Sequence, residues 1–114
     1  CPMIDARRME VYTALFNREG AQVTQVNAAI IDKYSFSGYL EKQPVIFFGE
    51  GSAKCKDVIN DRNAIFIDSF QPSARFMLPL ALKAYANEEF EDIAYFEPFY
   101  LKDFVATTPK NKIL

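Results

Sequence analysis

The sequence predicts a mixed α/β domain, in which a five-stranded mixed sheet carries helices on its faces. Its first thirty residues contain short apolar runs separated by polar turns, which is typical of an antiparallel meander. Two all-apolar runs follow, at residues 45–48 and 64–67, with a helix-length segment between them. That spacing is typical of parallel strands joined by a right-handed crossover. At 114 residues, half of them apolar and a quarter charged, the chain suits one core.

Three strands are expected before the first helix. Residues 3–4 form the first, and a tight polar turn at residues 5–8 leads into the second, at residues 10–16. Apolar side chains fall on both faces of this second strand, as they do in a central strand. A turn at residues 17–20, which ends on Gly20, leads into a third strand at residues 22–27. These connections make the three strands antiparallel neighbours.

Helices and buried strands alternate in the next segment. Ser35 is expected to cap a short helix that ends before Pro44, because proline lacks a backbone donor. Residues 45–48 are predicted as a strand that is buried on both faces. A turn at residues 49–52 follows, and Ser52 is expected to cap a helix at residues 53–59. Residues 64–67 repeat the buried-strand pattern, which Asp68 ends.

The longest helix is expected to open at residues 71–73, with Pro72 in its first turn. Its apolar positions form one stripe: Phe76, Met77, Leu80, Ala81, Ala84 and Tyr85. Because proline inside a helix costs about 3 kcal/mol, a kink or break is expected between Arg75 and Pro79. The aromatic segment at residues 95–101 is expected to lie extended against the body. Residues 95–104 also suit a contact with a second copy, so a homodimer stays open.

Charge and composition narrow the classes of function. Thirteen basic and fifteen acidic residues give a net charge of -2, and the lysines concentrate only at residues 102–112. A slightly acidic domain without a basic stripe is a poor candidate for holding RNA by itself. The two cysteines form no disulfide framework, which favours a reducing compartment, and we expect the cytoplasm. No apolar run is long enough to span a membrane.

Residue types also limit the chemistry. The chain has no histidine, so a histidine base or a histidine-bound metal is impossible within it. Asp5, Glu50 and Asp68 lie at predicted strand ends, where three carboxylates can hold a divalent cation. Two thiols remain open to two interpretations. Cys1 is either an amino-terminal nucleophile or a chain boundary, and Cys55, between two lysines, is either activated or an ordinary thiol.

The order of predicted elements is that of the ribonuclease H-like unit, which the actin-like ATPase superfamily uses twice per protein. Residues 4–16, with the sequence IDARRMEVYTALF, closely resemble the aspartate-alanine-arginine-arginine-x-glutamate-valine-tyrosine hairpin of bacterial TsaB (YeaZ) proteins. Residues 98–101, PFYL, resemble the terminal proline-x-tyrosine-leucine element of the same family. The resemblance implies that residues 1–104 form a single ribonuclease H-like domain, the second half of a two-domain protein, followed by a tail at residues 105–114.

The resemblance also implies a function. TsaB-type proteins are non-catalytic subunits that support the catalytic paralogue TsaD, together with the ATPase TsaE, in forming threonylcarbamoyladenosine at position 37 of tRNA. Such a subunit needs no cofactor of its own and meets tRNA only indirectly. Related proteins carry the label glycoprotease-like. The alternative is therefore a glycoprotease-like hydrolase, or a nucleotide-dependent transferase, that uses the strand-end carboxylates.

Two segments correspond to nucleotide-binding loops of the superfamily. In nucleotide-binding members the first hairpin is glycine-rich, so that the backbone can approach phosphate. Here Ala6, Arg7 and Arg8 follow Asp5, which indicates either a structural or partner-facing hairpin or a residual, degenerate phosphate loop. Gly49, Glu50 and Gly51 lie where the adenosine-contacting loop lies. They predict either a degenerate nucleotide site or merely a tight connection.

Overall fold

The first three strands form an antiparallel sheet with the predicted meander. The computed structural model describes residues 1–103. Strand β1 (Met3–Asp5) pairs with β2 (Glu10–Thr13), and β2 pairs with β3 (Asn27–Ile30). β2 therefore lies at the centre, as predicted. Val11 and Thr13 point from it into the core, whereas Glu10 and Tyr12 are half-buried on the other face.

Two further strands form a separate parallel sheet. β4 (Val45–Phe48) runs parallel to β5 (Ala64–Ile67), as predicted for a crossover connection. Burial alternates along β4: Phe47 is fully buried, whereas Ile46 is 47% exposed. The prediction that these strands are buried on both faces is therefore wrong. In the described part of the chain, helices cover only the face that carries Val45 and Phe47.

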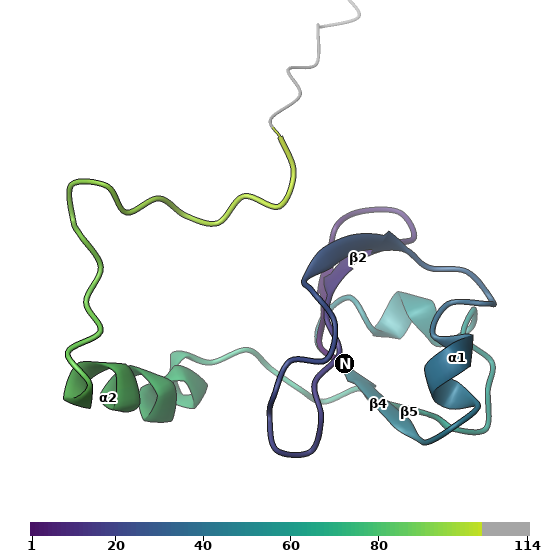
Figure 1. Cartoon of the computed structure of the whole chain (residues 1–114). Helices are drawn as coiled ribbons and strands as arrows, with labels where there is room; N and C mark the ends of the chain where they lie inside the picture. The colour runs from purple at the N-terminus through teal and green to yellow at the C-terminus, as the bar shows by residue number, and fades with distance from the viewer. Residues whose placement is uncertain (104–114) are drawn as a thin grey trace, which may run out of the picture.

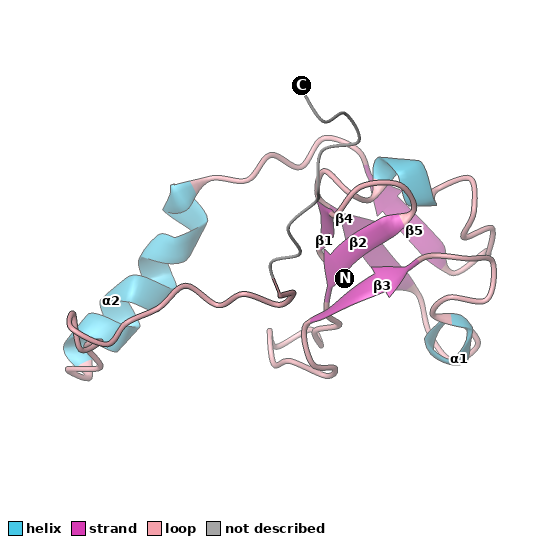
Figure 2. Ribbon diagram, turned by 90° about the horizontal axis from the view of Figure 1, so that it is seen from above, coloured by secondary structure: helices cyan, strands magenta, loops and turns pink. Residues whose placement is uncertain are grey.

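The two sheets meet where β1 begins beside β4. Pro2 and Phe48 form a parallel bridge, the Cys1 amine donates to the Ile46 carbonyl at 2.8 Å, and the Phe48 amide donates to the Cys1 carbonyl at 3.3 Å. The strands thus follow one another in space as β3, β2, β1, β4 and β5 (Figure 2). Ladder pairing stops after this bridge, so the structure contains a three-stranded and a two-stranded sheet and not one continuous sheet of five.

Phe47 lies at the centre of the core that joins the two sheets. Its ring lies 5.2 Å from that of Phe36 and 5.1 Å from that of Phe66, measured between centroids. Short helices close the same side: α1 (Ser37–Leu40) buries Leu40, and the 3₁₀ helix η1 (Ala53–Cys55) buries Cys55. Other members of this core are Met3, Val11, Leu15, Ile31, Val45 and Ile59.

The third strand lies further along the chain than predicted. Residues 22–27 form no continuous strand: Gln22 makes only an isolated bridge with Phe16, and Val23 and Val26 are 53% and 42% exposed. The Asn17 side chain accepts from the amides of Glu19 and Ala21 and so fixes a turn that carries the chain outward. The small side chains of residues 28–29 then pair with β2 instead.

Neither serine caps a helix through its side chain: Ser52 is the N-cap residue of η1, as predicted, but makes no capping hydrogen bond, and Phe36 takes the N-cap position of α1 in place of Ser35. Both helices are shorter than predicted. The Ser35 hydroxyl donates to the Asp32 carboxylate, and α1 begins after it, at Ser37. The Ser52 hydroxyl donates to the Gly49 carbonyl at 2.7 Å, and only the single turn of η1 follows, where a helix over residues 53–59 was predicted. In both places the hydroxyl stabilises the loop before the helix and not the helix itself.

The chain after β5 forms an arm, residues 68–103, that leaves the body, residues 1–67 (Figure 1). Ser73 accepts from the Arg75 amide and opens a 3₁₀ helix, η2 (Ala74–Met77), which passes into α2 (Leu78–Ala86). The predicted break between Arg75 and Pro79 is confirmed, because Pro79 falls in the first turn of α2, where no amide donor is needed. None of the side chains of α2 is buried.

The aromatic segment is exposed, so the prediction that residues 95–101 lie against the body is wrong. Tyr95, Phe99 and Tyr100 are 83%, 80% and 78% exposed. The arm returns at Lys102, whose Nζ donates to the Glu10 carboxylate. The radius of gyration is 17.8 Å, against about 13 Å for a compact domain of about 100 residues. Among residues 1–103, no helix is long and apolar enough to cross a membrane. The predicted tail at residues 105–114 lies outside the described residues.

The packing of Gly51 against β1 yields a prediction on stability. A Cβ at Gly51 would lie 2.9 Å from the carbonyl carbon of Ile4, so Gly51→Ala is expected to lower the free energy of unfolding by about 1–3 kcal/mol. Gly38 in α1 is the matched control, because a Cβ there meets nothing within 4 Å. Gly38→Ala should raise stability by about 0.5–1 kcal/mol. Urea unfolding midpoints measure both, and equal effects of the two substitutions would contradict the account.

Candidate functional site

The two candidate nucleotide loops lie against each other at the junction of the sheets. The Gly51 amide donates to the Met3 carbonyl at 3.0 Å, which attaches the loop after β4 to the backbone of β1. A Cβ at Gly49 would lie 2.5 Å from the Met3 oxygen, and Gly49 has a φ of +99°. Both glycines are therefore required for backbone-to-backbone packing. The close approach that they permit is used by the chain's own strand.

Lys54, in η1, closes the junction from the other side. Its Nζ donates to Oδ1 of Asp5 and, at 2.7 Å, to the carbonyl of Glu10. One side chain thus binds both strands of the β1–β2 hairpin. In the sequence, Lys54 was considered only as a neighbour of Cys55, and this role was not predicted. A lysine soon after a glycine turn is a weak signal, because its partners here are 49 and 44 residues away.

Asp5 is held as a carboxylate by two donors. The hydrogen bond from Lys54 and then the one from the Arg7 amide, at 2.9 Å, lower the pKa of Asp5 below its ordinary value of 3.8. Its side chain is half exposed, so solvent screens the ion pair. Both hydrogen-bond donors to the Asp5 carboxylate are therefore groups of this chain.

The hairpin turn has the backbone of a glycine turn without glycine. Arg7 and Arg8 have φ values of 74° and 50°, and both are exposed. Consecutive left-handed residues are typical of hairpin turns that use asparagine and glycine, and each other residue there costs about 1–2 kcal/mol. The turn is closed by the Ala6 amide, which donates to the Glu10 carbonyl at 3.1 Å. Two charged side chains therefore occupy strained positions at the tip.

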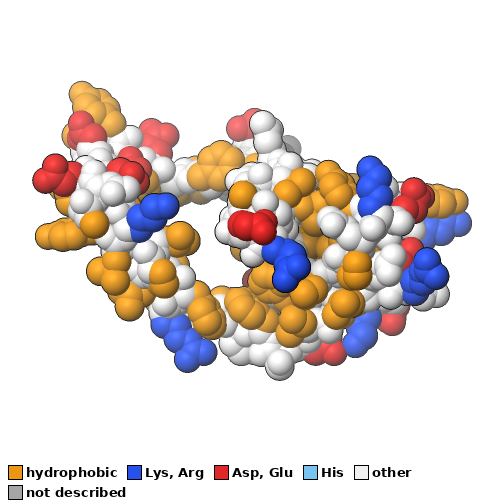
Figure 3. All heavy atoms as spheres, turned by 60° about the horizontal axis from the view of Figure 1, so that its bottom comes forward, with side chains coloured by type: hydrophobic (Ala, Val, Ile, Leu, Met, Phe, Trp, Pro, Cys, Tyr) orange, Lys and Arg blue, Asp and Glu red, His pale blue; other side chains and the backbone are white. Residues whose placement is uncertain are grey.

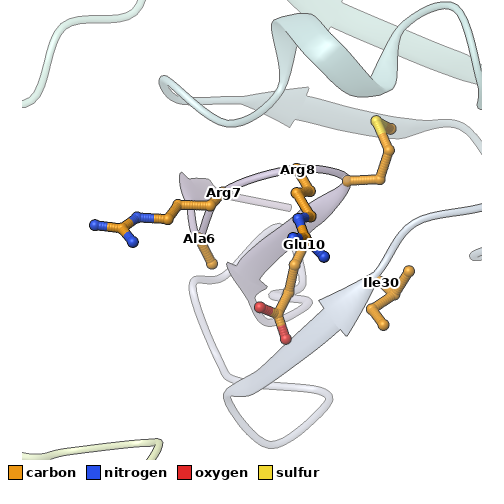
Figure 4. A pocket seen from close by; sticks show the side chains of 6 residues that line it. Ala6, Arg7, Arg8, Glu10 and Ile30 are labelled. Atoms are coloured by element: carbon orange, nitrogen blue, oxygen red, sulfur yellow. The ribbon is translucent and has the colours of Figure 1, made fainter. Parts of the chain in front are cut away.

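A hollow lies beside this tip (Figure 4). It has a volume of about 530 Å³ and is lined by Ala6, Arg7, Arg8, Met9, Glu10 and Ile30. The Arg7 side chain extends away from Glu10 and Ile30 in this view. Glu10 is already paired with Lys102. The predicted hairpin residues Asp5, Arg7 and Arg8 thus share one turn, but the carboxylate of Asp5 pairs with Lys54, whereas both arginines are exposed and line the hollow.

The strand-end carboxylates do not gather into the cation site that the enzyme alternative would need. Asp5 pairs with Lys54, and Asp68 pairs with Lys56 at 2.9 Å. Glu50 is exposed in the loop between them. Among residues 1–103, no three histidine, cysteine or acidic side chains lie close enough together to hold a metal ion. The alternative interpretation, in which Asp5, Glu50 and Asp68 hold a divalent cation together, therefore has no support in their positions.

The thiols are packed in the core. Cys55 is fully buried, and its thiol donates to the Gly51 carbonyl at 3.3 Å. Burial raises the pKa of the Cys55 thiol, although Lys54 acts in the opposite direction. The interpretation of Cys55 as an activated thiol is wrong, because desolvation outweighs the neighbouring charge. The Cys1 thiol is also buried, 3.1 Å from the Thr13 hydroxyl.

The ion pair predicts how stability responds to acid. The pKa of Asp5 is lower in the folded chain than its ordinary value of 3.8. The contribution of Asp5 to folding stability is therefore complete above pH 3.8 and is lost as the pH falls through the lowered pKa of the folded state. Lys54→Met removes the main cause of the shift, so the loss of stability between about pH 5 and about pH 2 should become smaller. Urea midpoints across this range measure it.

Two controls accompany that measurement. Lys83→Met removes an exposed lysine of α2 and should leave the acid dependence unchanged. Asp32→Asn should remove a different part of the acid dependence of stability, because hydrogen bonds from the Tyr34 amide and the Ser35 hydroxyl also lower the pKa of Asp32. A Lys54→Met profile parallel to that of the unaltered chain would contradict the role of Lys54.

Comparison with known proteins adds no assignment: no protein-family model matches this chain, and no curated protein matches it. The residues themselves therefore supply the grounds for a function. These are a hairpin with two strained arginines, a glycine loop packed on β1, and a lysine that joins the two.

Proposed function

We propose that this chain is a non-catalytic, TsaB-type subunit that acts in the cytoplasm. In this role it supports a TsaD-type catalytic paralogue and a TsaE-type ATPase in the formation of threonylcarbamoyladenosine at position 37 of tRNA. It contributes a surface and a fold, whereas the partners supply the chemistry. Contact with tRNA is indirect, in keeping with a net charge of -2.

The arrangement of strands supports this proposal. An antiparallel trio followed by two parallel strands, in the spatial order β3, β2, β1, β4, β5, is compatible with a ribonuclease H-like unit. The β1–β2 hairpin is the segment whose sequence resembles TsaB proteins. A continuous sheet would require β1 and β4 to extend the pairing that begins at Pro2 and Phe48.

One observation carries the non-catalytic part of the proposal, namely that the junction is filled by the chain itself. Residues that would admit phosphate in a nucleotide-binding relative here pack backbone on backbone at Gly49 and Gly51. Lys54 occupies the remaining approach to Asp5. A nucleotide would have to displace a core contact of β1, so these residues do not fit one. The hydrolase and transferase alternative loses its cation site for the reason given above.

The two arginines support a partner-facing hairpin. A strained backbone persists where the surrounding structure enforces it, and such strain concentrates at functional positions. Arg7 and Arg8 place two permanently charged guanidinium groups at the tip of a hairpin that Lys54 holds firmly. Guanidinium groups bind carboxylates in a bidentate manner, so an acidic surface of the catalytic paralogue is the fitting counterpart.

Disruption of the gene tests the proposal. Its loss should reduce threonylcarbamoyladenosine in tRNA that reads codons beginning with adenine, as measured by mass spectrometry of digested tRNA. The full coding region should restore the nucleoside, and so should a Glu50→Gln, Asp68→Asn variant, because these carboxylates do no chemistry. An unchanged nucleoside level after disruption, or a folded double variant that fails to restore it, would overturn the proposal.

The strained hairpin allows stability and support to be separated. Arg8→Gly relieves about 1–2 kcal/mol of left-handed backbone strain in the folded chain. Glycine also makes the unfolded chain more flexible, which costs about 0.5–1 kcal/mol of stability, so the urea midpoint should rise only slightly. The variant should nevertheless restore less threonylcarbamoyladenosine to tRNA than the unaltered chain does, because one contact with the catalytic partner is lost. Arg62→Gly, at another exposed arginine, is the control and should not stabilise the fold. If Arg8→Gly leaves support intact, the hairpin does not face the partner.

A further inference from the structure

The outer edge of β3 carries backbone groups that pair with no other strand. On the inner side, the Ile31 amide donates to the Met9 carbonyl at 2.8 Å, and Ala29 lies two residues earlier on that same side. Because hydrogen-bonded and free positions alternate along an antiparallel strand, the amides and carbonyls of Ala28 and Ile30 point outward. In the described part of the chain, no group bonds to them. These donors and acceptors remain for a further strand.

Nothing in β3 itself blocks such a strand. Exposed sheet edges are usually protected by lysine, proline or a bulge. β3 has the sequence NAAI, with none of these residues, and it pairs with β2 in unbroken register. Ala28 and Ala29 are small enough for another backbone to approach, and Ile30, which is 76% exposed, offers an apolar side chain to it. The edge is therefore open to an extended segment.

This edge ends at the hollow beside the hairpin tip. Ile30 lines the hollow, and so does Glu10, its partner in the ladder between β2 and β3. Figure 4 shows Arg8 and Glu10 on the hairpin and Ile30 on the neighbouring strand. Glu10 is paired with Lys102, whereas Arg8 makes no ion pair within residues 1–103. The end of β3 thus joins free backbone groups, an apolar side chain and an unpaired cation.

Other apolar surfaces of the molecule lack one of these features. Figure 3 shows hydrophobic side chains gathered on the arm and on the body. The Phe70 ring packs on Phe48, at 4.9 Å between centroids, and Phe76 is stacked on Phe70 at 5.7 Å, so the chain's own arm lies on the outer face of β4. A cavity of about 1040 Å³ beside that face is lined by Arg18 and Glu19, whose opposite charges select no sign of charge in a ligand.

We propose that a partner protein adds an extended segment to the outer edge of β3, with an apolar residue beside Ile30 and an acidic residue that reaches Arg8. The backbone of this segment bonds to the outward groups of Ala28 and Ile30, which supplies affinity. The apolar side chain leaves water, and the carboxylate forms a charge-assisted hydrogen bond with the guanidinium. This inference deepens the proposed function, on which it depends only for the protein that supplies the segment.

Peptide binding, followed through the amide resonances of the labelled full chain, tests the inference. The probe is the blocked pentapeptide Glu-Thr-Val-Thr-Glu, in which a glutamate lies on the same face as the valine for either strand direction. The amides of Ala28 and Ile30 should shift saturably, and saturating peptide should slow their hydrogen exchange by about tenfold or more. In the free chain both amides should exchange quickly, because no group bonds to them.

Variants separate the contributions of charge and backbone. Arg8→Gln should weaken peptide binding by about tenfold, because the charge-assisted bond is lost, whereas Arg62→Gln, at another exposed arginine, should leave it unchanged. Ala28→Pro removes an outward donor and keeps the ladder with β2, so it should abolish binding. Circular dichroism confirms that each variant is folded. If Ala28→Pro does not fold, a pentapeptide with methylated backbone nitrogens makes the same test, because it cannot donate and should not bind.

Four results would contradict the inference. The first is the absence of a saturable shift at Ala28 and Ile30, and the second is equal binding of the methylated pentapeptide. The third is equal binding of a pentapeptide with lysine in place of glutamate. The fourth is slow exchange of both amides in the free chain, because the edge would then already be covered. None of these results touches the proposed function, which the level of the modified nucleoside after gene disruption measures separately.

Discussion

The backbone contact between β1 and the loop after β4 is the constraint on which the rest of the structure depends. Gly51 donates to Met3 across it, and any side chain at Gly49 or Gly51 would collide with β1. This contact brings the antiparallel and parallel sheets together, so that Phe47 and Met3 can share one core. It also places η1 where Lys54 reaches both strands of the hairpin. Fold and site thus have a common origin, since the same glycines that unite the sheets fill the space that a ligand would need.

Periodicity in the sequence predicted those elements that are defined by local pattern. The hairpin, the parallel pair and the break at Pro79 follow from apolar alternation and from proline's missing donor, and all three are confirmed. The third strand was misplaced because Val23 and Val26 resemble a strand locally, whereas Asn17 fixes a turn that moves pairing to residues 27–30. Covered faces were overpredicted for β4 and β5, because an all-apolar run does not reveal whether a helix lies on its second side.

The sequence predicted where the two candidate loops lie but not which groups they contact. Both candidate loops lie near each other, at the ends of β1 and β4, as their sequence positions suggested. A glycine pair permits close approach equally to a ligand or to another strand, and the sequence cannot distinguish the two. The bond from Lys54 to Asp5 spans 49 residues and has no local signature. Left-handed backbone at Arg7 and Arg8 is also unexpected from residue type, because arginine rarely adopts it.

A titration of the isotopically labelled chain with magnesium and ATP, followed through its backbone amide resonances, tests the central claim most directly. If the chain's own backbone and Lys54 fill the junction, the amides of Gly51 and Arg7 should not shift, because their donors are already bonded to Met3 and Asp5. A saturable shift of both amides, together with one at Lys54, would show that a nucleotide enters between β1 and the glycine loop. That result would contradict the account.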